Sequence, residues 1–307
     1  MRGRRCLAGL ALAVLLAAPP AAGDPLPVTE IAPGVYVHEG VQAEAGPEND
    51  GAIANIGFIV GDDAVMVIDT GGTAAEGERL REAVRRVSQL PIRYVVLTHV
   101  HPDHIFGAAA FAANEPEIIG HAKLPGALAQ RGAYYLRNLK RDLGEKAEGS
   151  TVVAPTRLVS GTEAVDLGNR LVRIEARGHA HTDNDLSLFD DRTRTLWLSD
   201  LLFVDRVPVI DGSLVGWLKE LDALEKVGAA RAVPGHGPPS VPWPLAATAE
   251  KRYLETVLEE TRAAVKSGVD IADAWRRVAV GEKARWLLFD DYHPRNVTTA
   301  YKELEWE

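Results

Sequence analysis

The sequence has 307 residues, of which 46% are hydrophobic and 25% charged, and its formal net charge is −9. This composition is typical of a globular protein with a sizeable core and excludes a disordered chain. The first 23 residues hold three arginines and no acidic residue, so the chain without them would have a net charge of −12. A surface this acidic repels phosphate backbones, and we therefore expect no nucleic-acid partner.

The N-terminus has the pattern of an export signal. Three arginines precede an unbroken apolar run at residues 7–18, and two prolines and three small residues follow the run. The run is short for a membrane span, which favours a cleaved signal peptide over residues 1–23 rather than an uncleaved anchor. We expect a periplasmic protein with no membrane contact beyond export. The single cysteine, Cys6, lies in this segment, so histidines and carboxylates must supply any metal ligands of the mature chain.

The rest of the chain, residues 24–307, shows no repeat and no linker, which predicts a single domain. In its first half, β-branched runs and helical spacing alternate. They predict strands at 34–38, 53–60, 64–68, 92–97 and 118–119, and helices at 74–87, 106–113 and 124–143.

The second half returns to strands and ends in helices. The patterns predict strands at 172–175, 186–189, 195–198 and 231–233, and helices at 214–227 and 244–278. The tail 286–307 gives no clear pattern. Two strand-rich halves, each with helices, predict two sheets packed face to face with helices outside and a C-terminal helical extension. Ligands would then bind on the loops at one edge of the sandwich.

The strongest chemical signal is the run of four histidine and aspartate side chains between Thr98 and His104, directly after the predicted strand 92–97. In an extended loop, His99 and His101 project to the same side, because side chains alternate. Asp103 and His104 then turn toward a neighbouring position as a helix begins. Imidazole and carboxylate are ligands that Zn²⁺ accepts in a site without thiols. The spacing therefore predicts a metal site, with a histidine-rich surface loop as the alternative.

This motif resembles the signature of the metallo-β-lactamase superfamily. Four further segments match in order: Asp69-Thr70-Gly71, Gly178-His179-Ala180-His181-Thr182, Ser199-Asp200 and Pro234-Gly235-His236-Gly237. The resemblance implies an α/β (α+β) fold, the four-layer αββα sandwich. It also implies two zinc ions, or alternatively iron or manganese. The implied ligands are His99, His101 and His181 for the first ion and Asp103, His104 and His236 for the second, with Asp200 bridging.

Each of these residues also has an ordinary structural interpretation. His236 between two glycines could be part of a simple turn, and Asp200 could cap a helix. We expect Asp69 to accept hydrogen bonds that orient the metal loop, and His179 to face solvent or support a ligand. Three histidines have no motif around them, and three aromatic residues either line a pocket or pack in the core: His38, His121 and His293, and Tyr134, Tyr135 and Trp217.

The implied chemistry is hydrolysis of a small-molecule substrate. Two zinc ions that share a water give a hydroxide that attacks an ester, thioester, lactone or amide carbonyl. Asp103 would be the catalytic residue that orients this nucleophile. Asp200 favours glyoxalase-II-like hydrolases over the β-lactamase subclass that lacks a bridging aspartate. A metallo-β-lactamase and a single-iron sulfur dioxygenase remain alternatives.

A narrower resemblance is to the quinoprotein relay system zinc metallohydrolases. It depends on four segments: Ile31 to His38, Asp200 to Phe203, Asp211-Gly212-Ser213 followed by Gly216-Trp217, and the tail around Trp306. The resemblance implies a periplasmic role and a functional link to a pyrroloquinoline-quinone-dependent (PQQ) quinoprotein dehydrogenase. A non-catalytic accessory protein that binds metal during quinoprotein maturation is the alternative. Seven ligands argue for catalysis, because a structural zinc site needs only four.

Overall fold

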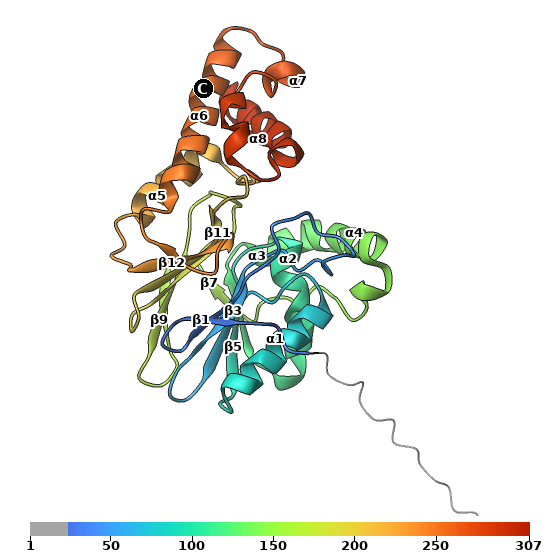
Figure 1. Ribbon diagram of the computed structural model, residues 1–307, viewed down its shortest axis with the longest axis vertical. Helices are drawn as coiled ribbons and strands as arrows, with labels where there is room; N and C mark the ends of the chain where they lie inside the picture. Colours follow the sequence, from blue (N-terminus) through green and yellow to red (C-terminus); the bar gives the residue numbers. More distant parts are fainter. Residues whose placement is uncertain (1–23) are drawn as a thin grey trace, which may run out of the picture.

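The computed structural model describes residues 24–307 as two β-sheets packed face to face, with helices on both outer faces (Figure 1). This arrangement confirms the predicted αββα sandwich. The predicted signal peptide, residues 1–23, lies outside the described residues. Within residues 24–307, no helix combines the length and the apolar character needed to cross a membrane.

The first sheet has seven strands, and their order in the sheet is their order in the chain. Its first four strands pair antiparallel, and the pairs from β4 to β7 are parallel. The strands are β1 (Thr29–Ala32), β2 (Val35–His38), β3 (Ile56–Val60), β4 (Val65–Ile68), β5 (Ile92–Leu97), β6 (Glu117–His121) and β7 (Arg157–Val159).

The central strands of this sheet are buried on both faces, which is why they read as continuous apolar runs. In β4, Val65 and Val67 pack against the outer helices, whereas Met66 and Ile68 pack between the two sheets. The helices on this side are α1 (Ala74–Val87), α2 (Pro102–Ile105), the 3-10 helix η1 (Phe106–Asn114), α3 (Leu124–Ala127), the π-helical turn η2 (Leu128–Gly132), α4 (Ala133–Leu143) and the 3-10 helix η3 (Gly144–Ala147).

Helix α1 begins where the sequence places its start and is fixed there by a capping arrangement. The Thr73 hydroxyl accepts from the backbone N–H of Glu76, and the Glu76 carboxylate accepts from the N–H of Gly72 at 2.8 Å. Leu80 and Val84, four residues apart, pack against the first sheet. The cap therefore joins α1 to the turn that follows β4.

The second sheet has six strands in the order β13-β12-β11-β10-β9-β8. Its pairs are antiparallel except for β11 and β12, which are parallel. The strands are β8 (Thr162–Asp166), β9 (Leu171–Ala176), β10 (Leu186–Asp190), β11 (Thr195–Phe203), β12 (Arg231–His236) and β13 (Val241–Pro242). All nine residues of β11 are buried, so the strand runs through the centre of the molecule.

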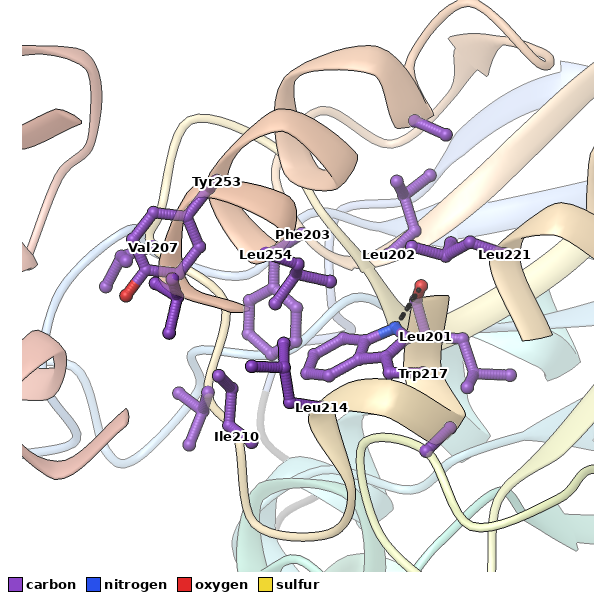
Figure 2. Close-up of a cluster of buried hydrophobic side chains, with 14 of the residues drawn as sticks. Leu201, Leu202, Phe203, Val207, Ile210, Leu214, Trp217, Leu221, Tyr253 and Leu254 are labelled. Carbon is purple, nitrogen blue, oxygen red and sulfur yellow. Dashed lines mark hydrogen bonds between the residues drawn. The ribbon is translucent and has the colours of Figure 1, made fainter. Parts of the chain in front are cut away.

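The C-terminal helices pack together against this sheet, in orange and red in Figure 1. They are α5 (Leu214–Leu224), α6 (Ala247–Lys266), α7 (Ile271–Ala274), the 3-10 helix η4 (Val280–Arg285) and α8 (Phe289–Leu304). Figure 2 shows the core beneath them, where Trp217 lies beside Phe203 and its indole N–H donates to the Leu201 carbonyl at 3.2 Å.

Several predicted elements differ from the observed ones. The single helix predicted over 244–278 is wrong, because the chain leaves α6 at Gly268, whose φ of +67° suits glycine, and restarts as α7. The predicted helix over 106–113 is a 3-10 helix, and the unassigned tail forms α8. The predicted strand 195–198 extends to Phe203. The short strands β1, β7, β8 and β13 were not predicted.

Candidate metal centre

The seven predicted ligands come together from four separate segments of the chain. His99 and His101 follow β5, and Asp103 and His104 lie on the short helix α2. The backbone is extended at His101 (φ −71°, ψ 148°) and becomes helical at Pro102. Asp103 and His104 therefore turn toward a position different from that of His99 and His101, as expected. The remaining three come from the second half: His181 from the loop between β9 and β10, Asp200 from β11, and His236 from the end of β12.

The first group consists of His99, His101, His181 and Asp200. His101 Nδ1 lies 3.1 Å from His99 Nε2 and 2.9 Å from His181 Nε2. Asp200 Oδ2 lies 3.4 Å from His181 Nε2 and 3.7 Å from His99 Nε2. Three imidazole nitrogens and one carboxylate oxygen therefore surround one point, which is the donor set of a four-coordinate zinc site.

The second group consists of Asp103, His104 and His236. Asp103 Oδ2 lies 3.6 Å from His104 Nε2 and 3.4 Å from His236 Nε2. Asp200 also reaches this group, with Oδ1 3.1 Å from His104 Nε2 and Oδ2 3.4 Å from His236 Nε2. The Asp200 carboxylate thus faces both groups at once.

The outward nitrogens of these histidines contact oxygens that fix their orientation. An imidazole nitrogen beside a carbonyl or carboxylate oxygen carries the ring proton, which leaves the other nitrogen free to bind a metal. His181 Nδ1 donates to the Val209 carbonyl at 2.7 Å, and His236 Nδ1 donates to the Ile53 carbonyl at 2.8 Å. His101 is reversed: its Nε2 donates to Asp211 Oδ2 at 3.1 Å, and its Nδ1 faces the group.

Asp69 holds the metal loop from beneath, as predicted for a structural carboxylate. It is fully buried and accepts from the Thr98 N–H at 2.9 Å and from the Thr98 hydroxyl at 2.8 Å. It also accepts from His104 Nδ1 at 2.9 Å and from the Ser199 hydroxyl at 3.0 Å. One carboxylate therefore connects the metal loop to the strand that carries Asp200.

Burial makes several of these groups ready to bind a cation. Burial lowers the pKa of His181 to about 3 and the pKa of His99 well below its usual range, so both rings are neutral at pH 7. Burial also opposes the charge on Asp200, but the neighbouring His236 and His104 outweigh it and hold the pKa of Asp200 well below its usual range. Burial likewise opposes a charge on His104, but the neighbouring Asp200 outweighs it and raises the pKa of His104 well above its usual range. The centre thus offers the neutral imidazoles of His99 and His181 and the ionised carboxylate of Asp200, and a bound cation would replace the proton on His104.

The residues fit a pair of metal ions. His104 Nε2 and Asp200 Oδ1 are both buried, and neither has a hydrogen-bond partner among residues 24–307, although they lie 3.1 Å apart. Two lone-pair atoms this close repel one another unless a proton or a cation neutralises them. His104 Nε2 belongs to the second group, and Asp200 Oδ1 faces that group from the first one. Nitrogen and oxygen donors without sulfur suit zinc, iron or manganese.

A pocket of about 490 Å³ opens over the two groups, and His101, Asp103, His181, Asp200 and His236 line its floor. Tyr134 and Tyr135 line its wall, one of the two roles expected for them, together with charged and aromatic residues that the sequence did not place in a pocket: Arg131, Arg206, Asp211, Tyr292 and Arg295. A larger hollow of about 680 Å³, on the second sheet, contains none of the seven predicted ligands. We therefore place the site in the smaller pocket.

The other residues singled out in the sequence lie outside the two groups. His179 is exposed, and His38, His121 and His293 bond elsewhere in the fold. Tyr134 and Tyr135 line the pocket, whereas Trp217 is fully buried and packs edge-on against His181 with ring centres 5.3 Å apart. The sequence indicated Asp211 only as part of a family motif and gave no sign of its contact with the site. Single arginines on helices have no sequence pattern that predicts a pocket.

Comparisons with known proteins identify the family of the chain. The family model described as "Metallo-beta-lactamase superfamily" matches residues 49–236. Among curated proteins, the linear primary-alkylsulfatase of a Pseudomonas species is 25% identical over 66% of this chain and 43% of its own length. The chain spans about half the length of the curated relatives it matches.

Solved structures share the fold. The stereoselective inverting sec-alkylsulfatase from Pseudomonas sp. has a TM-score of 0.68 and 17% identity, over 90% of this chain and 50% of that one. The metallo-beta-lactamase from Pontibacter korlensis has a TM-score of 0.61 and 17% identity, over 75% of this chain and 99% of that one. The family model covers more than half of the sequence and contains all seven clustered residues. The chain belongs to the metallo-beta-lactamase superfamily.

Proposed function

We propose that the protein is a binuclear zinc hydrolase that cleaves an ester, thioester, lactone or amide of a small molecule. The observation that carries this proposal is the position of Asp200, whose two oxygens lie 3.1–3.7 Å from nitrogens of both histidine groups. A single metal ion would leave one of these groups without a cation. The five imidazoles favour zinc over manganese, and iron is the alternative metal that accepts the same donors.

The chain's own residues would position both the ions and the substrate. A bound pair of zinc ions supplies Lewis acidity and lowers the pKa of a shared water. Asp103 is the ligand best placed to orient the attacking water, because its side chain is 16% exposed toward the pocket whereas that of Asp200 is 5% exposed. Asp103 Oδ2 can also hold a proton on its way to the leaving group. Phe203 and Val209 line the pocket and limit its water.

Sulfate-ester hydrolysis is a second candidate. It is favoured by the resemblance to the linear primary-alkylsulfatase and by the three arginines of the pocket. β-Lactam hydrolysis and a non-catalytic accessory role remain alternatives. The likeness to the Pontibacter korlensis enzyme carries the fold alone, and the bridging position of Asp200 argues against the β-lactamase subclass without such a residue.

We also propose a cellular context for the protein. Residues 1–23 would be removed on export, leaving residues 24–307 as one periplasmic domain with a C-terminal helical extension. The motifs shared with quinoprotein relay system zinc metallohydrolases support work beside a PQQ-dependent dehydrogenase. Asp211, part of one of these motifs, contacts His101 in the structure, so that motif has a physical role at the centre.

The test is hydrolysis by zinc-loaded residues 24–307 of a panel holding 4-nitrophenyl esters, thioesters, lactones, 4-nitrophenyl sulfate and a chromogenic cephalosporin. We expect turnover of a carboxylic ester, thioester or lactone that His101→Ala abolishes. His179→Ala is the matched control, because His179 is exposed and lies outside both groups. Turnover confined to the sulfate or the cephalosporin would select the corresponding alternative. Inactivity toward the whole panel would favour the accessory role.

A further inference from the structure

Asp211 connects the candidate metal centre to two arginines from distant parts of the chain. Its Oδ2 lies 3.1 Å from His101 Nε2, and the guanidinium groups of Arg131 and Arg295 both donate to the same carboxylate. Arg131 belongs to η2, one of the helical segments on the side of the first sheet, whereas Arg295 belongs to the C-terminal helix α8. Two guanidinium groups bound to one carboxylate thus form this part of the pocket wall.

This pairing leaves positive charge and hydrogen-bond donors unused. The Asp211 side chain is 11% exposed, but those of Arg131 and Arg295 are 41% and 55% exposed where the pocket opens. A guanidinium has five N–H donors. Within residues 24–307, the hydrogen bonds of Arg131 go to Asp211 and Tyr135, and that of Arg295 goes to Asp211. Both forks therefore retain donors for another acceptor.

A third arginine raises the positive potential from the other side of the pocket. Arg206 is 3% exposed and lies beside His236, with its guanidinium 5.1 Å above the Tyr292 ring. The nearest carboxylate is that of the exposed Glu44, at 3.8 Å. Arg206 still raises the local positive potential, because it is buried from water whereas the Glu44 carboxylate that pairs with it is exposed and screened.

We propose that Arg131 and Arg295 bind an oxyanion carried by the substrate, so that this enzyme acts on anionic esters, thioesters or lactones. The planar fork of a guanidinium matches the paired oxygens of a carboxylate, sulfonate or phosphate. The inference rests on the proposed function, because it places the anion relative to a scissile carbonyl at the zinc ions.

The geometry also sets where the oxyanion lies along the substrate. The guanidinium groups are separated from the metal-facing Nδ1 of His101 by the carboxylate of Asp211 and the imidazole ring of His101 itself. The oxyanion and the scissile carbonyl are therefore joined by a spacer and are not the same group. This requirement distinguishes the proposed substrate from a simple alkyl sulfate, whose anionic group is itself cleaved.

The kinetic test compares two esters of the same acid, mono-4-nitrophenyl adipate and its neutral methyl ester; the adipate chain is long enough to disfavour attack of the free carboxylate on its own ester. We expect the native enzyme to prefer the anionic ester in kcat/KM. Arg131→Gln combined with Arg295→Gln should reduce that preference by about 10- to 100-fold, mainly through KM, because each lost contact is a hydrogen bond to a charged group. Arg131→Lys should restore part of it. An unchanged preference would overturn the proposal.

Arg262→Gln is the control variant, because Arg262 pairs with Glu307 and lies outside the pocket; it should keep the native preference. Esters carrying a sulfonate or a phosphate in place of the carboxylate identify which oxyanion is bound best. The ratio of the two substrates is the readout, so a general loss of activity through His101 does not imitate the expected result.

A binding measurement separates this proposal from the proposed function. The probes are 1-naphthoate and the neutral 1-naphthamide, followed by fluorescence with zinc-loaded and with metal-depleted protein. We expect naphthoate to bind more tightly than naphthamide in both forms, and the double variant to weaken naphthoate about tenfold or more. This result can hold even if no ester is hydrolysed. Equal binding of the two probes, or binding of neither, would contradict the oxyanion site.

Discussion

The Oδ2 of Asp69 lies 2.9 Å from Nδ1 of His104, and the same carboxylate accepts from Thr98 and Ser199. Asp69→Asn keeps the shape but replaces one acceptor oxygen by a donor amide, so buried donors lose their partner. We expect the variant to bind zinc at the second group about 10- to 100-fold more weakly. Competition with a chromogenic chelator measures this affinity. Asp62→Asn, at an exposed position, should bind zinc as the native protein does.

The packing around Trp217 predicts a link between the C-terminal helices and the site. Trp217 is fully buried, contacts His181 and donates to the Leu201 carbonyl (Figure 2). Trp217→Leu should lower the free energy of unfolding by about 3 kcal/mol, because it leaves a cavity and an unpaired carbonyl. Chemical denaturation of the metal-depleted protein measures this change. Trp306→Leu, at a side chain that is 85% exposed, should change the free energy of unfolding little; equal losses in both variants would contradict the packing.

Glu76 predicts a pH-dependent stability. Burial raises its pKa to about 8 in the folded protein, against 4.5 for the free side chain. Between these values the folded state holds a proton that the unfolded state has lost, so the Glu76 contribution to stability falls as the pH rises from about 4.5 through 8. Glu76→Gln removes this loss and keeps an acceptor for the Gly72 N–H.

Melting temperatures of Glu76→Gln and the native protein at pH 5 and pH 8.5 measure the effect. At the higher pH, the free energy of unfolding of the variant relative to the native protein should rise by on the order of a few kcal/mol, and its melting temperature should rise accordingly. Glu78→Gln on the same helix is the control, because the Glu78 side chain is 51% exposed and water solvates its charge in both states. A difference between Glu76→Gln and native protein that stays constant with pH would refute the assignment.

The sequence was most informative where a local pattern coincides with a local structure. The run from His99 to His104 follows a buried strand, and the apolar spacing of residues 74–87 matches α1 at both ends. Resemblance then brought in His181, Asp200 and His236, whose individual patterns were ambiguous. Short edge strands such as β7 contain too few residues to show an alternating pattern.

The pocket wall could not be predicted for a different reason. Arg131, Arg206 and Arg295 are ordinary residues of their own segments, and they converge only through the packing of η2 and α8 near Asp211 and His236. Long-range convergence of this kind leaves no periodicity or spacing in the chain. The strand predicted at 195–198 is too short because polar Ser199 and Asp200 end its apolar run in the sequence. In the structure β11 continues to Phe203, with a register shift against β12 at Ser199, whose φ is 48°.

The zinc content of the purified chain 24–307 tests the central claim most directly. Elemental analysis after zinc loading and removal of free metal should give two zinc ions per chain for the native protein. It should give one for His236→Ala, which removes a ligand of the second group, and two for His38→Ala, whose ring bonds to the Pro27 carbonyl away from the site. One ion or none in the native protein, or two in His236→Ala, would contradict a binuclear centre.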